Sequence, residues 1–249
     1  MCRHLAYVGP PVTLESLLLQ PPHSLWHQAR APKYQTFGKT NPDGFGVGWY
    51  DRDVRPEPAR YRTATPIWKD EMFAGIAALV RSNAVLAAVR AASPGMPIEE
   101  DATAPFVDGP WLFSHNGFVP GFSSTVGRAL RAEISAQRAD ELTATTDSQL
   151  LFALVLDRLD AGATAADALV SVIELVEGLV PARLNLLLTD GERIAATAVR
   201  NSLFVFDDRD LTGAVVIASE PHDDKPAWEA VPDGSLVEFG DEKLEIRPL

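Results

Sequence analysis

The sequence predicts an α+β fold with antiparallel sheets, and two observations lead to this expectation. Apolar residues recur at helical spacing in the centre of the chain, whereas short apolar runs typical of strands follow from residue 182 onward. Helices and strands that are segregated in this way are typical of α+β folds rather than of doubly wound parallel sheets. No flexible linker divides the 249 residues, so we expect a single domain over residues 1–249.

The individual elements follow from capping and turn residues along the chain. Thr13 is a suitable N-cap for the first helix, which Pro21 ends, and a further helical turn follows near Leu25. Glycines at alternate positions of the strand within residues 41–50 leave one face bare, which suggests that another backbone or a ligand approaches it. Asp190-Gly191 is a two-residue hairpin signal between the strands at 183–189 and 193–200, and the strands from residue 182 onward are expected to form a meander. The remaining expected helices are 69–81, 124–137, one that Thr145, Thr146 and Asp147 open, and one from Thr164; the remaining strands are 84–90, 111–114, 183–189, 193–200, 202–206, 214–218, 235–239 and 243–247.

Composition narrows the classes of function. The net charge is −12 and the basic residues are scattered singly, which disfavours nucleic acid because phosphate binding needs clustered Lys and Arg. A single cysteine excludes an internal disulfide, and His4, His115 and His222 lack metal-binding spacing, so we expect no metal and no cofactor. Residues 1–30 lack signal-peptide features and no segment is long enough to cross a bilayer. We therefore expect a cytoplasmic chain without membrane contact, and the sequence leaves its oligomeric state open.

The single cysteine, Cys2, is the candidate nucleophile. Removal of Met1 would place a thiol and a free α-amine on one residue. The amine has a reference pKa of about 7.7–8.0 and the thiol of about 8.5, so the amine is a plausible proton acceptor near neutral pH. An N-terminal amine is a recognised base for an adjacent nucleophile. The alternative is that Cys2 is only a small buried apolar residue.

Three further sites supply the groups that amide hydrolysis needs. Such chemistry requires a nucleophile, donors for an oxyanion, a cation for a carboxylate and an anion for an ammonium group. Arg90 ends an apolar strand, Asn116-Gly117 follows another strand, and Asp147 opens a helix. Each also has an ordinary interpretation, namely a surface ion pair, a turn and a helix cap. Their combination with Cys2 favours the catalytic interpretation.

The order of these sites, together with Asp43-Gly44-Phe45-Gly46, resembles the class II glutamine amidotransferases, which are N-terminal-nucleophile hydrolases. The resemblance implies a four-layer αββα sandwich with two antiparallel sheets and a small-molecule γ-glutamyl substrate. It also implies the role of each site residue. Cys2 would attack with its own α-amine as base, the Asn116 side chain and the Gly117 N–H would form the oxyanion hole, Arg90 and Ser93 would hold the substrate α-carboxylate, and Asp147 would hold the α-ammonium group.

The chain departs from the glutamine-using members in the loop after Arg90, where Ala91 and Pro94 replace their Trp and His. Short segments at 1–4, 41–46, 104–106, 183–185 and 218–224 instead resemble stand-alone γ-glutamyl amidohydrolases of ergothioneine biosynthesis. Their substrate carries a trimethylammonium group, for which tryptophans could provide an aromatic face. The candidates are Trp26, Trp49, Trp68, Trp111 and Trp228.

Three alternatives to this function remain open. They are a hydrolase of glutathione-type γ-glutamyl peptides, a glutaminase that supplies ammonia to a separate synthase, and a non-enzymatic ligand-sensing or scaffold relative.

Overall fold

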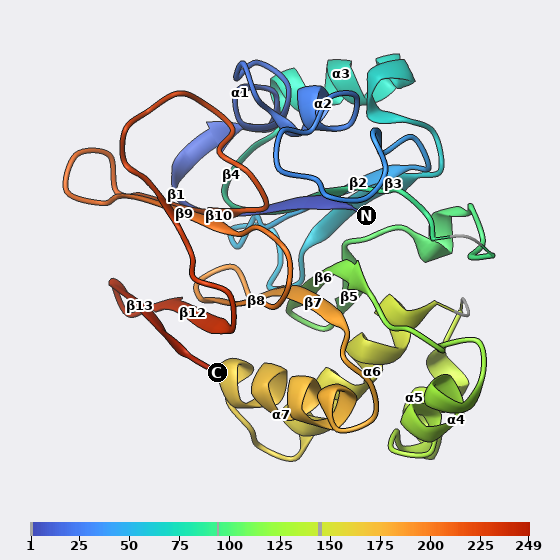
Figure 1. Cartoon of the computed structure of the whole chain (residues 1–249). Coiled ribbons are helices and arrows are strands. Elements are labelled where there is room, and N and C mark those ends of the chain that lie inside the picture. Colours follow the sequence, from blue (N-terminus) through green and yellow to red (C-terminus); the bar gives the residue numbers. More distant parts are fainter. Residues whose placement is uncertain (1, 94, 144–145) are drawn as a thin grey trace.

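The computed structural model describes residues 2–93, 95–143 and 146–249, which form two antiparallel sheets between two helical layers (Figure 1). This arrangement confirms the predicted four-layer αββα sandwich. The first sheet has the order β11-β9-β10-β1-β4-β2-β3, and the second has the order β13-β12-β8-β7-β6-β5. Helices α1, α2 and α3 cover the outer face of the first sheet, and α6 and α7 cover that of the second (Figure 1).

The bounds of the elements are as follows. The first sheet comprises β1 (Arg3–Thr13), β2 (Phe45–Trp49), β3 (Ala59–Thr63), β4 (Arg81–Val89), β9 (Phe204–Asp208), β10 (Ala214–Ala218) and β11 (Trp228–Ala230). The second comprises β5 (Phe106–Asp108), β6 (Trp111–Phe118), β7 (Arg183–Thr189), β8 (Ile194–Ala198), β12 (Ser235–Gly240) and β13 (Lys243–Pro248). The helices are α1 (Leu14–Leu18), α2 (Leu25–Gln28), α3 (Glu71–Leu79), α4 (Thr125–Arg131), α5 (Ala136–Glu141), α6 (Asp147–Asp160) and α7 (Ala165–Glu177), with 3₁₀ turns at Ile67–Lys69 and Glu100–Ala102.

The position of β1 in the sheet decides where the beginning of the chain lies. β1 pairs with β4 on one side and with β10 on the other, so its first residues are enclosed by neighbouring strands. Side chains alternate between the two faces of a strand. Leu5 and Tyr7 accordingly pack under the α1–α3 layer, whereas Ala6 belongs to the cluster between the two sheets. His4 and Cys2 share the face of Ala6, which places Cys2 toward the space between the sheets.

The helical layer on the second sheet was predicted well because its caps and its periodicity are strong. Thr146 caps α6 by accepting from the Gln149 N–H, and Thr164 caps α7 by accepting from the Asp167 N–H. Burial of the apolar faces of both helices against the second sheet stabilises this layer, at about 1.5–3 kcal/mol for each fully buried Leu or Val. Thr145, which the sequence also assigned to the start of α6, lies outside the described residues.

Several predicted elements were wrong in extent or in pairing. The expected helix over 124–137 is two short helices, α4 and α5. Asp190-Gly191 opens a four-residue loop, residues 190–193, in which Asp190 Oδ1 accepts from the Glu192 and Arg193 N–H groups. The C-terminal strands are not one meander, because β9, β10 and β11 join the first sheet while β12 and β13 return to the second.

The bare face of the glycine-rich strand has the close neighbours that the sequence predicts. A side chain at Gly46 would overlap the carbonyl oxygen of Ala104, and one at Gly48 would approach Leu112 Cδ1 to 2.6 Å. Both neighbours belong to the second sheet or to the segment that leads into it. The glycines of β2 therefore allow the two sheets to approach closely next to the site described below.

None of the helices in the described part of the chain combines the length and the apolar character that a bilayer crossing requires.

Candidate active site

The pairing of β1 with β4 brings Cys2 next to Arg90. Arg3 lies opposite Val89 in this antiparallel register, so the residues that precede Arg3 and follow Val89 are neighbours. The Cys2 Sγ lies 4.0 Å from the carbonyl oxygen of Ala91, and the residue is partly buried. Two segments that are almost 90 residues apart in the sequence thus meet at the sulfur.

A small cavity adjoins Cys2 between the sheets. It has a volume of about 20 Å³, which is room for about one water molecule. The lining residues are Cys2, Ala88, Val89, Arg90, Ala102, Ala104, Phe106, Ser114, His115 and Ser148.

The tryptophan hypothesis is not supported by this arrangement, because the cavity lining includes no tryptophan among the described residues. Trp26, Trp49, Trp68 and Trp228 pack against the core under the α1–α3 layer, and Trp111 packs against the core under α6 and α7. All five are only partly buried, so the expectation that one of them contacts the leaving group stays a prediction.

Arg90 presents a buried cation toward this cavity. Its backbone is fixed, because its N–H donates to the Gly44 carbonyl at 2.8 Å and its carbonyl accepts from the Asp43 N–H at 2.9 Å. Its side chain is 8% exposed, and Nη1 is buried without a hydrogen-bond partner among the described residues. The guanidinium forms no ion pair with any carboxylate of residues 2–93, 95–143 and 146–249. Arg90 is therefore a buried cation without an ion-pair partner among the described residues, in contrast to the surface ion pair of the ordinary interpretation.

Asp147 is the corresponding buried anion. Thr146 caps α6, so Asp147 is not needed for that role. Its Oδ2 accepts from the Val119 N–H at 3.1 Å, and its Oδ1 accepts from the Ser148 N–H at 2.8 Å. No cation of the described chain forms an ion pair with it, and Ser148 connects it to the cavity that Arg90 lines.

Asn116 and Gly117 lie within β6, so the interpretation of this dipeptide as a turn is wrong. They pair across the sheet with Asn185 and Leu184 of β7. Asn116 is completely buried; its Nδ2 donates to Ser219 Oγ at 3.2 Å, and its Oδ1 is without a partner among the described residues. A side chain at Gly117 would overlap the Arg183 carbonyl oxygen and His115 Nε2, so only glycine fits there.

His115 and Ser93 differ in how they relate to the cavity. His115 Nε2 donates to the Arg183 carbonyl at 2.9 Å, which leaves Nδ1 to accept from the Ser148 hydroxyl at 3.1 Å. Both ring nitrogens are thus occupied, and His115 is a framework residue rather than a base for Cys2. Ser93 follows Arg90 by three residues but is not among the residues that line the cavity, and its contact with the substrate carboxylate stays a prediction.

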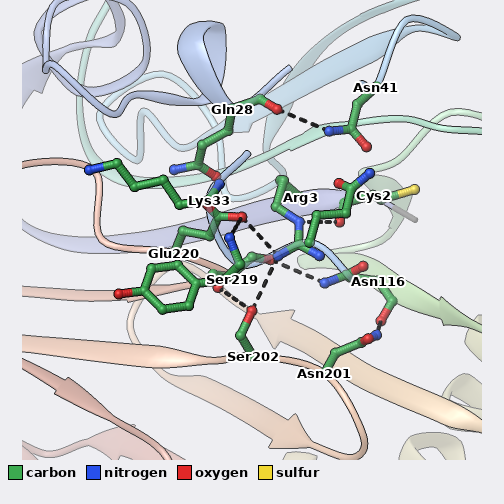
Figure 2. A network of polar contacts seen from close by, with 12 residues as sticks. Cys2, Arg3, Gln28, Lys33, Asn41, Asn116, Asn201, Ser202, Ser219 and Glu220 are labelled. Carbon is green, nitrogen blue, oxygen red and sulfur yellow. Dashed lines mark hydrogen bonds and ion pairs between the residues drawn. The ribbon is translucent and has the colours of Figure 1, made fainter. Parts of the chain in front are cut away.

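A buried ion pair that the sequence analysis missed holds the backbone of Cys2 (Figure 2). Arg3 Nε donates to the Cys2 carbonyl at 2.8 Å, and Arg3 Nη1 lies 3.1 Å from Glu220 Oε1. Glu220 also accepts from the N–H groups of Lys33 and Tyr34, at 2.7 and 3.0 Å. Burial lowers the pKa of Arg3, and the Glu220 carboxylate opposes this shift. The sequence signal was the segment 218–224, which matched the stand-alone enzymes but received no role.

Beside this ion pair, His4 is a buried imidazole that bridges the two sheets. It is fully buried, and its Nδ1 lies 3.1 Å from Ser114 Oγ of β6. Burial lowers the pKa of His4 well below its ordinary value of 6.5, and the charges of Arg3 and His115 add to this effect. The native state therefore keeps His4 neutral under conditions in which the unfolded chain takes up a proton.

We expect the free energy of unfolding to decrease as the pH falls below 6.5, because only the unfolded state then protonates His4. One such site contributes a slope of at most about 1.4 kcal/mol per pH unit. Urea denaturation at a series of pH values checks this expectation. His4→Gln removes the titrating ring and should show a shallower slope, although His222, whose pKa burial also lowers, titrates in both proteins. An equal slope in both proteins would contradict this assignment.

The layered fold and a cysteine at the head of its central strand define the class of protein. The family model for class-II glutamine amidotransferases matches residues 31–211, and the chain belongs to this family. It is 42% identical to a gamma-glutamyl-hercynylcysteine sulfoxide hydrolase of Mycolicibacterium smegmatis, over 100% of both chains. A class-II glutamine aminotransferase domain protein of Silicibacter pomeroyi is similar in structure, with a TM-score of 0.70 and 26% identity over 99% of both chains. The PRPP amidotransferase of B. subtilis shares the fold, with a TM-score of 0.65 and 14% identity over 99% of this chain and 49% of its own.

Proposed function

We propose that this protein hydrolyses the γ-glutamyl amide of γ-glutamyl-hercynylcysteine sulfoxide and releases glutamate and hercynylcysteine sulfoxide. The observation that carries the proposal is a pair of buried opposite charges: Arg90 lines the cavity, and Asp147 lies directly before Ser148, which also lines it. Arg90 and Asp147 have no ion-pair partner in the described chain, and they match the α-carboxylate and the α-ammonium group of a γ-glutamyl substrate. The full-length identity to the mycobacterial hydrolase supports the choice of leaving group.

Cys2 is the nucleophile in this proposal. After Met1 is removed, its α-amine takes the thiol proton and Sγ attacks the γ-carbonyl carbon. The tetrahedral oxyanion accepts hydrogen bonds from the Asn116 side chain and from the Gly117 N–H. When the C–N bond of the substrate amide breaks, the protonated α-amine of Cys2 gives its proton to the leaving amine. The glutamyl group remains bound to Cys2 as a thioester. Water then hydrolyses the thioester, which releases glutamate and restores the thiol.

The buried charges orient the substrate for this attack. A bidentate contact between Arg90 and the α-carboxylate would fix one end of the glutamyl chain, and Asp147 would fix the α-ammonium group next to it. The γ-carbonyl then lies at a set distance from these two groups, which selects γ-glutamyl over α-linked amides. Ser93, three residues after Arg90, would add a contact to the carboxylate.

The experiment that tests the proposal follows glutamate release by protein with a native N-terminus. The substrates are γ-glutamyl-hercynylcysteine sulfoxide, glutathione and glutamine in parallel. A clear preference for the first supports the proposal. A preference for glutathione would favour a hydrolase of γ-glutamyl peptides, and a preference for glutamine would favour a glutaminase subunit. Release from none of them, in protein that lacks Met1 by intact mass, would favour a non-enzymatic role.

Arg90→Gln is expected to lower kcat/KM by about 10- to 100-fold, mainly through KM. The variant removes a charge-assisted contact to the α-carboxylate, which is worth about 1.5–3 kcal/mol. Steady-state kinetics with γ-glutamyl-hercynylcysteine sulfoxide measures the effect. Arg55→Gln is the matched control, because Arg55 is exposed and lies in the loop between β2 and β3. A KM for Arg90→Gln equal to that of the control would exclude this role of Arg90.

A further inference from the structure

Ser219 is fully buried and lies directly after β10. It contacts both β1, the strand that follows Cys2, and the side-chain amide of Asn116. Its Oγ accepts from the His4 N–H at 3.0 Å and from Asn116 Nδ2 at 3.2 Å. Its backbone is also tied to β1, because its N–H donates to the His4 carbonyl at 2.9 Å. Two hydrogen bonds thus fix β1 to Ser219 at His4, two residues after Cys2.

The hydrogen bonds around Ser219 and Asn116 leave one donor and one acceptor unmatched. A hydroxyl group has one O–H donor and two acceptor lone pairs. Both lone pairs of Ser219 are occupied, whereas its O–H has no acceptor among the described residues. Asn116 Oδ1 is buried and also lacks a partner among them. An unmatched donor and an unmatched acceptor therefore belong to two groups that are already in contact.

A half-turn of the Asn116 amide matches both groups. Asn116 Oδ1 would then accept from the Ser219 O–H, and Nδ2 would take the place that Oδ1 leaves. Figure 2 shows this place on the side of the amide away from Ser219. In the proposed mechanism, the oxygen of the substrate γ-carbonyl lies there. An N–H donor there stabilises a developing oxyanion, whereas a carbonyl oxygen in the same place repels it. The two orientations of the amide thus differ in catalytic competence.

We propose that Ser219 is a positioning residue that sets the orientation of the Asn116 amide during catalysis. In the substrate complex, its hydroxyl donates to Asn116 Oδ1 and thereby directs Nδ2 to the substrate γ-carbonyl. Ser219 Oγ also accepts from the His4 N–H of β1. This one oxygen atom therefore contacts both Asn116 and the strand that follows Cys2. This inference rests on the proposed function, since it concerns the hydrolytic site of that activity.

Ser219→Ala tests the proposal in kinetic terms. We expect kcat for γ-glutamyl-hercynylcysteine sulfoxide to fall by about 10- to 100-fold, the usual effect of losing a group that orients a catalytic one. KM and the inhibition constant of L-glutamate should change less than about twofold, because Ser219 does not hold the glutamyl group. Ser82→Ala is the matched control, because Ser82 is a buried serine whose hydroxyl bonds only to backbone groups of Tyr50 and Ala84.

A double-mutant cycle separates positioning from a structural role. Asn116→Ala alone should lower kcat by about 10²- to 10³-fold through loss of the oxyanion donor. If Ser219 acts through Asn116, the double variant Ser219→Ala/Asn116→Ala is no slower than Asn116→Ala. If the two effects multiply, Ser219 acts by another route and the proposal is wrong.

The outcomes distinguish this inference from the proposed function. Wild-type protein that lacks Met1 and hydrolyses no γ-glutamyl compound would overturn the function and with it the inference. Active wild-type protein with a Ser219→Ala variant of equal kcat would overturn the inference alone. Should Ser219→Ala melt far below Ser82→Ala, the same comparison is made with Ser219→Cys. This thiol is close in size and is a weak donor, so we expect a smaller loss of kcat.

Discussion

Replacement of Cys2 by alanine is expected to abolish hydrolysis, with a loss in kcat of at least about 10³-fold, as for removal of the nucleophile in other covalent hydrolases. The thiol forms the covalent bond to the acyl group in the proposed reaction, so the variant lacks the nucleophile. Glutamate release from γ-glutamyl-hercynylcysteine sulfoxide measures the loss. Direct binding of L-glutamate to Cys2→Ala shows whether the pocket is intact. If Cys2→Ser retains some turnover, inhibition of that turnover by L-glutamate gives the same information.

A second form of the protein tests the base rather than the nucleophile. Protein with an uncleavable extension before Cys2 keeps the thiol, but its Cys2 nitrogen is an amide and cannot accept a proton. We expect this form to be nearly as inactive as Cys2→Ala, with intact mass confirming the state of the N-terminus. Full turnover by the extended form would show that another group is the base, and full turnover by Cys2→Ala would exclude the thioester mechanism.

Glu220→Ala is expected to lower the free energy of unfolding by about 3–5 kcal/mol, the usual effect of removing one partner of a buried ion pair. The Arg3 side chain is fully buried beside it, and it would remain as an uncompensated charge. The change also leaves the N–H groups of Lys33 and Tyr34 without their acceptor. Chemical denaturation, analysed with the same denaturant dependence (m-value) for both proteins, gives the difference in free energy of unfolding between the variant and the wild type.

Glu238→Ala provides the control for this effect, because Glu238 pairs with Arg247 on the exposed surface of β12 and β13. An exposed pair contributes about 0–1 kcal/mol, so this variant should be close to the wild type. Equal stability of the two variants would contradict the role of the buried pair. The free energy of unfolding of Glu220→Gln should lie between those of Glu220→Ala and Glu238→Ala, because glutamine loses the charge but keeps an acceptor for the N–H groups of Lys33 and Tyr34.

The predictable part of the fold is the part that local patterns specify. Thr13, Thr146 and Thr164 each cap a helix, as expected from their places before apolar periodic segments. The strand that ends at Arg90 was recognisable from its continuous apolar run. In contrast, β1 was not predicted, because Gly9, Pro10 and Pro11 interrupt it and their irregular pairing with β4 is set by the neighbouring strand.

The site shows the same division between local and long-range information. Cys2 was a candidate because it is the single cysteine and follows Met1 directly, whereas Arg90 and Asp147 were candidates because one ends and the other opens a recognisable element. Ser219 and Glu220 were not, because their meaning depends on contacts with residues more than 180 positions away. Asn116-Gly117 was ambiguous for a related reason, since only pairing with β7 distinguishes a strand from a turn at this dipeptide.

The central place of β1 has a consequence for how the protein is made. The residues that enclose the start of this strand, Ser219 and Glu220, are synthesised more than 200 positions after it. At about 5–20 residues per second, that interval is on the order of ten to forty seconds. During this time β1 lacks its β10 neighbour, so the first sheet does not yet enclose the amino end of the nascent chain. In the proposed mechanism, strand order thus provides an interval in which Met1 can be removed before the catalytic centre is complete.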